Sequence, residues 1–597
     1  MALLTLGPAL GALPQGVNLA ALEGWDIVVS PQALPSERYA AEEFQSHFAQ
    51  ASGYSLPIVQ TTDRPDRHVF IGPSEALQAS PVGFSVDEFG PEDLRIIIRD
   101  QNIAIAGGRP RGTLYGVYTF LEDYLGVRFL TPDHTHVPPV GAWRVVGPVD
   151  RFYHPPLGFR WSYYGETNQN PVFATRRRVN TVTDEARLGG KTGRSLISHS
   201  FGSQIPSAKY GQEHPEYYCE IDGQRRAQGN DWYDSEPCLT NPDVLRIVTE
   251  AVLAELQAHP ERENVSVSQN DNDKYCRCAQ CAAIDQREGT PMGSLLTFVN
   301  AVADEVAKVH PNVKVGTLSY WYSRKPPKTL KPRPNVQIQL CSIECCLIHP
   351  IDDPNCPKNV PFHRDMVQWG QLCDDIAIWN YNTNFSNYLL PCPNLRVIEP
   401  NIRYFVAHQA KGIFMQAAGN ALGAEFSDLR NYLISSLLWD PNRSGQQVID
   451  EFLNLHYGRA ADPIRRFINL VHDHAEASGL HPNCFGRAAD YAVDEAIAQA
   501  GLEAFAEALQ LAETEEIRSR VEKASICAYR AAIEPLWNLP DAAALTPELA
   551  ERMRPLARQF LQLCEKYGVT QFNEGMPMSE ARKRIRNLLG VSDDAEL

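Results

Sequence analysis

Residues able to carry out acid–base chemistry gather at one point of this 597-residue chain, in the run Asn264-Val265-Ser266-Val267-Ser268-Gln269-Asn270-Asp271-Asn272-Asp273. The first half of the run has the β-branched composition of a strand, and amides and carboxylates follow it directly. In an α/β barrel, catalytic groups project from the C-terminal ends of the strands. We therefore expect Asp271 to lie at the mouth of such a barrel.

Cleavage of a glycosidic bond usually requires a second carboxyl group, so that one is protonated and the other ionised. Glu344 is the predicted partner of Asp271, because it stands in the otherwise uncharged stretch 341–346, where the pKa of a carboxyl group can rise. A rim salt bridge for Glu344 and a helix cap for Asp271 are the structural alternatives. If the substrate carries a 2-acetamido group, its own carbonyl oxygen can attack, and Asn270 or Asp271 would then orient the amide.

The ends of other predicted strands carry aromatic, amide and carboxylate side chains. Sugars present apolar C–H faces and hydroxyl groups, so a carbohydrate site combines aromatic platforms with polar partners. For any single aromatic side chain, covering the top of the barrel is the alternative. The predicted substrate-binding residues are Trp161, Tyr164, Glu166, His199, Gln269, Tyr320, Trp321, Trp379, Tyr381, Asn382 and Gln416.

Three cysteines, Cys276, Cys278 and Cys281, follow the acidic run. They contain one Cys-x-x-Cys pair and no second pair at the usual distance, so Cys219, Cys238 or a histidine would have to complete a tetrahedral metal site. A structural metal, a disulfide and buried free thiols all remain open. No catalytic metal and no cofactor are predicted.

The secondary-structure elements that must position these residues are strands that alternate with helices along the chain. Residues 1–150 alternate strand and helix signals and predict a small α/β sandwich domain. Residues 151–441 predict a (β/α)8 TIM barrel, and residues 442–597 a C-terminal helical domain. The eight predicted barrel strands span residues 159–164, 178–182, 195–201, 265–270, 313–321, 336–342, 376–381 and 413–417.

Composition restricts the class of partner. The net charge of -17 argues against nucleic acid, since binding its backbone requires a basic face. No apolar run is long enough to span a bilayer. A neutral or weakly charged ligand fits the charge better, and the side chains at the strand ends make an oligosaccharide or glycan the expected partner. The N-terminal stretch lacks the basic residues of a signal peptide, which slightly favours a cytoplasmic location, with secretion open if the N-terminus is processed. The oligomeric state is not predicted.

Several motifs together resemble glycoside hydrolase family 163, the endo-β-N-acetylglucosaminidases, and the broader bacterial family around it. They cover about residues 155 to 460 and comprise residues 267–272 with Tyr275 and the three cysteines, 214–218, 238–242, 391–395 and 437–441. The stretch 111–118 with Leu121 and Glu122 is similar to the accessory domain that precedes the barrel in β-hexosaminidases and α-glucuronidases.

The resemblance implies retaining, substrate-assisted cleavage of a β-linked N-acetylglucosamine. The adjacent Asp-Glu pair of family 20 hexosaminidases is replaced here by Asn270-Asp271, so the acid of that family cannot be transferred. A glycosidase of other specificity, such as a glucuronidase, and a non-catalytic carbohydrate-binding barrel are the alternative functions.

Overall fold

The computed structural model describes residues 16–141 and 143–591 of the chain. The chain divides into two compact units. The first contains the residues up to Pro155 together with Pro171–Arg178 and Val182–Lys191. The second contains Pro156–Asn170, Val179–Thr181 and the chain from Thr192 onwards.

The first unit is built on a six-stranded sheet with helices α1 (Pro35–Ser52) and α3 (Gly112–Phe120) packed against each other. Its strands lie in the order β10-β5-β6-β4-β2-β3, and pairing is parallel from β6 through β4 and β2 to β3. The α/β sandwich predicted from the sequence is confirmed. The bounds are β10 Val149–Tyr153, β5 Leu94–Arg99, β6 Asn102–Gly107, β4 His68–Ile71, β2 Asp26–Val28 and β3 Ile58–Val59.

The second unit contains a six-stranded parallel sheet in the order β11-β18-β17-β16-β15-β14. Consecutive strands are neighbours and the last strand returns to the first, which is the strand order of a (β/α)8 barrel. Every residue of β16 is buried, as expected for a parallel sheet covered on both faces. The strands are β11 Phe159–Tyr163, β14 Asn264–Ser266, β15 Lys314–Ser319, β16 Val336–Cys341, β17 Ile376–Tyr381 and β18 Ala410–Gln416.

Two of the eight predicted strands, 178–182 and 195–201, are wrong, because both segments are irregular up to the start of a short helix at Phe201. At these two places, asparagine side chains make hydrogen bonds to the neighbouring backbone where a strand would pair through its own backbone. Asn180 accepts a hydrogen bond from the backbone of Arg160 and donates one to Gly158, beside β11. Asn264 bonds to both the N–H and the carbonyl of Ser195 beside β14. The two segments therefore flank the open edges of the sheet without forming strands.

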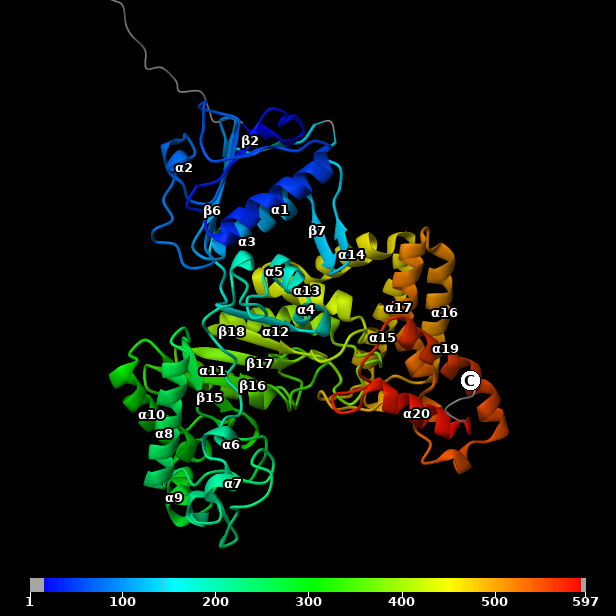
Figure 1. The fold of residues 1–597 in the computed structure, drawn as a ribbon. Coiled ribbons are helices and arrows are strands. Elements are labelled where there is room, and N and C mark those ends of the chain that lie inside the picture. Colours follow the sequence, from blue (N-terminus) through cyan, green and yellow to red (C-terminus); the bar gives the residue numbers. More distant parts are fainter. Residues whose placement is uncertain (1–15, 142, 592–597) are drawn as a thin grey trace, which may run out of the picture. The chain divides into compact units, whose positions relative to one another are not determined.

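Helices lie between the strands of the second unit, and Figure 1 shows α8 and α10 side by side next to β15. Helix α8 begins where Asn241 caps the N–H groups of Asp243 and Val244, with Pro242 at its first position. The longer helices among the strands are α8 Pro242–Ala258, α9 Ala279–Glu288, α10 Met292–Val309, α11 Val360–Leu372, α12 Leu395–Ala407 and α13 Ser427–Trp439.

The rest of the second unit is helical, and α16, α17 and α19 pack in sequence as seen in Figure 1. A shared hydrophobic core connects this helical region to the barrel, since Leu389, which follows β17, packs with Phe560, Phe572 and Ile585. Among the described residues, no helix has the length and apolar character needed to cross a membrane. The helices are α14 Gly445–Tyr457, α15 Ala461–Ala477, α16 Glu495–Leu511, α17 Glu515–Ala532, α18 Glu534–Trp537, α19 Pro547–Lys566 and α20 Met578–Leu588.

Candidate active site

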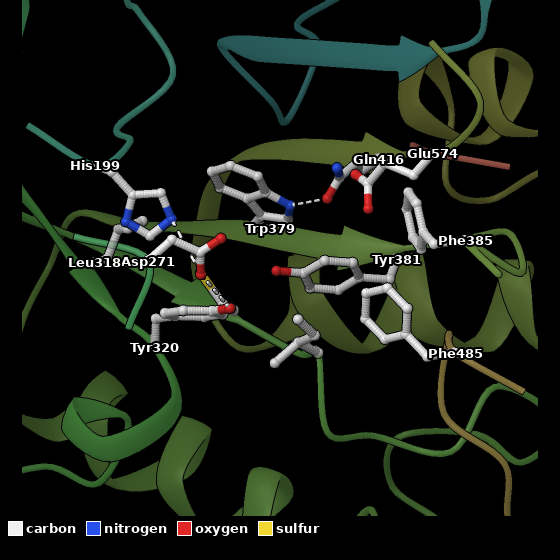
Figure 2. Close-up of a pocket in the computed structure, with 12 residues that line it drawn as sticks. His199, Asp271, Leu318, Tyr320, Trp379, Tyr381, Phe385, Gln416, Phe485 and Glu574 are labelled. Carbon is white, nitrogen blue, oxygen red and sulfur yellow. Dashed lines mark hydrogen bonds and ion pairs between the residues drawn. The ribbon is translucent and has the colours of Figure 1, made fainter. Parts of the chain in front are cut away.

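A cavity of about 140 Å³ opens at the C-terminal ends of the barrel strands (Figure 2). Strands β16, β17 and β18 each contribute a residue at or near their last position, and Tyr320 directly follows β15. This is the end of a parallel barrel where active sites form. The cavity is lined by His199, Asp271, Leu318, Tyr320, Cys341, Ile343, Trp379, Tyr381, Phe385, Gln416, Phe485 and Glu574.

Asp271 lies on one side of the cavity and has two polar neighbours. The Tyr320 hydroxyl donates a hydrogen bond to Oδ1 of Asp271 at 3.0 Å, and His199 Nε2 lies 3.9 Å from the same oxygen. His199 Nδ1 is 2.7 Å from the carbonyl oxygen of Gln269, which turns Nε2 towards the carboxylate. Burial and the charge of Asp271 raise the pKa of Tyr320, so its hydroxyl stays protonated as a donor.

The amides beside Asp271 bond to the backbone of neighbouring loops. Asn270 accepts a hydrogen bond from the N–H of Gly202 and donates one to the carbonyl of Ser235, and its own backbone N–H donates to Glu236. Asn272 donates to the same carbonyl of Ser235. Asn270 and Asn272 are buried, whereas the Asp271 side chain is 43% exposed. Asn270, predicted to orient the acetamido group, lies outside the residues that line the cavity and bonds to the backbone of Gly202 and Ser235.

Aromatic side chains form the other walls. Trp379 and Tyr381 stack at 6.3 Å between ring centroids, and Phe385 packs against Phe485 at 5.6 Å. The indole N–H of Trp379 donates to Oε1 of Gln416 at 2.6 Å, which fixes the amide and leaves its NH₂ group as a donor at the cavity (Figure 2). The arrangement offers apolar surfaces with a few placed polar groups, as carbohydrate sites do.

Glu574, a residue absent from the sequence predictions, supplies a second carboxyl group to the cavity. It lies in the loop between α19 and α20, and its N–H donates to the carbonyl of Phe385 at 3.1 Å. Three residues after Phe385, the N–H of Tyr388 donates to the carbonyl of Phe572, so two backbone hydrogen bonds hold the loop of Glu574 against the barrel. Loss of water around the carboxyl group, and then the charge of Asp271, raise the pKa of Glu574.

Glu344, the predicted acid, does not line the cavity. Its carboxylate lies 2.5 Å from Arg324 Nη1, and Nε of the same guanidinium lies 2.9 Å from the buried Asp365. Burial raises the pKa of Glu344, while Arg324 acts in the opposite direction. The rim salt bridge, considered as the structural alternative, is the arrangement found.

The predicted substrate-binding residues fall into two groups. His199, Tyr320, Trp379, Tyr381 and Gln416 line the cavity together with Asp271. The other six do not line it. Tyr164, Gln269 and Asn382 are buried, and so is Glu166, which accepts hydrogen bonds from Gly423 and Ser427. The indole N–H of Trp161 donates to Asn168, and Trp321 is exposed outside the cavity.

Five cavity residues besides Glu574 were also missed, namely Leu318, Cys341, Ile343, Phe385 and Phe485. Phe485 and Glu574 belong to the helical region, where the search for strand ends does not reach. A signal was present in the sequence, because Gln571-Phe572-Asn573-Glu574-Gly575 combines an aromatic, two amides and a carboxylate between two helical stretches. That composition resembles the rim of the barrel more than a helix connection.

Comparison with solved structures defines the class of fold. A GH138 enzyme that targets pectin rhamnogalacturonan II matches with a TM-score of 0.49, 10% identity and coverage of 95% of this chain and 98% of that one. The chain is also similar over 96% of its length to 80% of a family GH115 4-O-methyl-α-glucuronidase with specificity for decorated arabinogalactans, with a TM-score of 0.53 and 11% identity. The likeness to the GH115 enzyme shows the fold alone, which is a TIM-barrel type with an N-terminal domain.

The particular family follows from the sequence. The family model described as "Domain of unknown function (DUF4838)" matches residues 129–469, more than half of the chain, and the chain belongs to this family. A probable α-glucuronidase A of Aspergillus fumigatus is 28% identical over 127 residues, which are 20% of this chain and 15% of that protein. The chain therefore matches only a small part of this curated relative. Membership of glycoside hydrolase family 163 stays a prediction.

Proposed function

We propose that the protein is a glycoside hydrolase that cleaves β-linked N-acetylglucosamine in glycans, with retention of configuration and with the acetamido group of the substrate as nucleophile. The observation that carries the proposal is the pair of carboxyl groups at one cavity, Asp271 and Glu574. Their surroundings differ, because Asp271 accepts a hydrogen bond from Tyr320 whereas the pKa of Glu574 is raised. A carboxyl group with a raised pKa suits the protonated role, and a carboxylate that accepts a hydrogen bond suits the ionised one.

In the first step, the acetamide oxygen of the sugar attacks its own anomeric carbon while the glycosidic C–O bond breaks. Glu574 gives its proton to the departing oxygen, and Asp271 accepts the hydrogen bond of the acetamide N–H as positive charge develops on the amide. In the second step, the Glu574 carboxylate takes a proton from water, which attacks the anomeric carbon and restores the acetamide. Two inversions at this carbon give net retention.

An acetamido sugar suits the cavity better than a uronic acid. The twelve cavity residues in the described part of the chain include no Lys or Arg, and two of them are carboxyl groups. A glucuronate carboxylate would meet negative charge with only His199 as a possible cation. The methyl group of an acetamide, by contrast, finds apolar surface on Trp379, Tyr381 and Phe385.

The test compares aryl β-glycosides of N-acetylglucosamine and of its β-1,4-linked disaccharide with the aryl β-glucoside and aryl α- and β-glucuronides. We expect at least one acetamido substrate to be cleaved at least ~100-fold faster than the glucoside and glucuronides, in line with the contribution of a positioned catalytic group. Proton NMR of the first product should show the β-anomer. Preferential glucuronide cleavage, an α-anomer as first product, or binding of the disaccharide without turnover would overturn the proposal.

A further inference from the structure

Four cysteines converge beside the segment that carries Asp271. Cys276, Cys278 and Cys281 follow Asp271 in the chain, and Cys238 joins them from the loop that ends at α8. All four are buried, and their Sγ atoms lie within 4.8 Å of one another. From the sequence, the fourth member of this cluster could be Cys219, Cys238 or a histidine. In the structure, it is Cys238.

The spacing of the sulfur atoms matches metal ligands better than a disulfide. The Sγ atoms of Cys238 and Cys278 are 3.8 Å apart, far beyond the roughly 2.05 Å of a sulfur–sulfur bond. Two thiolates bound to one zinc ion at about 2.3 Å each are separated by roughly 3.8 Å in a tetrahedron. The N–H of Glu220 donates to Cys276 Sγ at 3.4 Å, and the Thr240 hydroxyl lies 3.3 Å from Cys281 Sγ. Such outer contacts stabilise metal-bound thiolates.

A second convergence of four ligand residues lies near the opposite wall of the cavity. Cys346, His349 and Cys356 come from the loop between β16 and α11, and His481 from the connection between α15 and α16. Cys346 Sγ lies 3.2 Å from Nδ1 of His349, and Cys356 Sγ lies 3.2 Å from Nδ1 of His481. Both cysteines are buried, and one ligand atom from each of the four residues fits within 4.8 Å.

We propose that the protein binds two structural zinc ions, one through Cys238, Cys276, Cys278 and Cys281 and the other through Cys346, His349, Cys356 and His481. Each set offers four ligand residues, so neither site keeps the open coordination position that a catalytic zinc needs. Thiolate and imidazole ligands in a tetrahedral set favour zinc over magnesium or calcium, which prefer oxygen.

The two ions would fix both sides of the cavity. The first ties the chain just after Asp271 to the loop before α8, and the second ties the loop after β16 to the segment that contains Phe485. That segment already bonds to the barrel loops, since Leu347 donates to the carbonyl of Pro482 and Phe385 to that of Cys484. Zinc would add metal–ligand bonds to these loop contacts and hold the cavity walls in one arrangement.

The decisive measurement is the metal content of the intact purified protein, by mass spectrometry with inductively coupled plasma. We expect two zinc ions per chain in the wild type and one in each of Cys278→Ser and Cys356→Ser. The matched controls are Cys219→Ser and Cys345→Ser, buried cysteines next to each site that are not ligands in the proposal; both should retain two zinc ions. Unchanged zinc content in the ligand variants would overturn the assignment, as would iron in place of zinc.

X-ray absorption at the zinc edge of the wild type tests the same proposal without any variant, in case a substitution prevents folding. One site with four sulfurs and one with two sulfurs and two nitrogens give an average of three sulfur ligands at about 2.3 Å and one nitrogen at about 2.0 Å. An average of four sulfurs would remove the site with histidine. Two disulfides among the first four cysteines, found by alkylation and mass spectrometry, would remove the other. Neither result depends on the protein being a glycosidase.

Discussion

Two glutamates in different regions of the second unit offer contrasting candidates for the proton donor. Glu344 follows a barrel strand, where sequence reasoning places an acid, but its carboxylate is paired with Arg324 and lies outside the cavity. Glu574 lies in a loop of the helical region, and the charge of Asp271 adds to the effect of burial in raising its pKa. A neighbouring cation favours the ionised form of a carboxyl group, whereas a neighbouring anion favours the protonated form.

The difference teaches that the position of an acid after a barrel strand does not decide whether it reaches the cavity, since burial raises the pKa of both glutamates but only Glu574 lines the cavity. Arg324 holds two carboxylates together, Glu344 and the buried Asp365, so this region resembles a structural ion pair. The loop of Glu574 is held by its backbone to the chain near Phe385 and Tyr388, which leaves the carboxyl group directed at the cavity (Figure 2).

Substitution of the two glutamates should have the largest and most unequal effect. We expect Glu574→Gln to lower kcat by ~100-fold or more, because the amide cannot donate the proton, and Glu344→Gln to leave kcat within about threefold. The measurement is steady-state hydrolysis of the best acetamido substrate from the panel above, with circular dichroism to verify folding. The reverse pattern would return Glu344 to the role of acid.

Leaving groups of different acidity give the control for this pair. An aryl glycoside with a strongly acidic phenol needs little proton donation, so Glu574→Gln should lose much less activity on it than on a poor leaving group. A loss that is equal for both leaving groups would show that Glu574 acts in binding or folding instead.

Removal of the hydroxyl group beside Asp271 should have an intermediate effect. Tyr320→Phe deletes the 3.0 Å hydrogen bond to the carboxylate while keeping the ring that lines the cavity. Hydrogen bonds to charged groups contribute about 1.5–3 kcal/mol, so we expect kcat/KM to fall by about tenfold or more. Kinetics at the pH optimum measure this loss. Unchanged kinetics would mean that Asp271 is positioned by other contacts.

The smallest expected effect is a shift of the pH profile. Glu574 must be protonated to act as the acid, so activity falls as the pH rises through its raised pKa. The charge of Asp271 contributes to that rise, and Asp271→Asn removes it; the alkaline limb of the residual activity should therefore move to lower pH. A sensitive fluorogenic substrate makes the measurement possible. A limb that stays in place or moves to higher pH would argue against electrostatic coupling of the two groups.

The sequence predicted the barrel well where strands form by backbone pairing alone. The range predicted for β17 agrees with the structure at both ends, whereas β14, predicted to end at residue 270, already ends at Ser266. The segments 178–182 and 195–201 were mistaken for strands because they occupy the right places in the alternation. Asn180 and Asn264 make the edge contacts there with side chains, and no periodicity in a sequence reports such a substitution.

The residues of the site also divide into those that the order of strands predicts and those that depend on contacts in the folded chain. Asp271, Tyr320 and Trp379 could be found because each lies at or within a few residues of the C-terminal end of a strand, so local order along the chain is enough to place them at one edge of the sheet. Of the amides beside Asp271, Asn270 was assigned to the substrate, although its hydrogen bonds to Gly202 and Ser235 use both ends of its side chain. Only the folded loop reveals that both the nitrogen and the oxygen of this amide already bond to the backbone.

The sequence by itself determined the alternation of strands and helices and the edge at which Asp271 stands, because periodicity and strand order are local properties of the chain. The tertiary structure alone decided which second carboxyl group joins Asp271, which cysteine completes the cluster after it, and which histidine reaches Cys356. Each of these choices brings together segments far apart along the chain, and the packing of loops that fixes them leaves no periodic signal in the residues themselves.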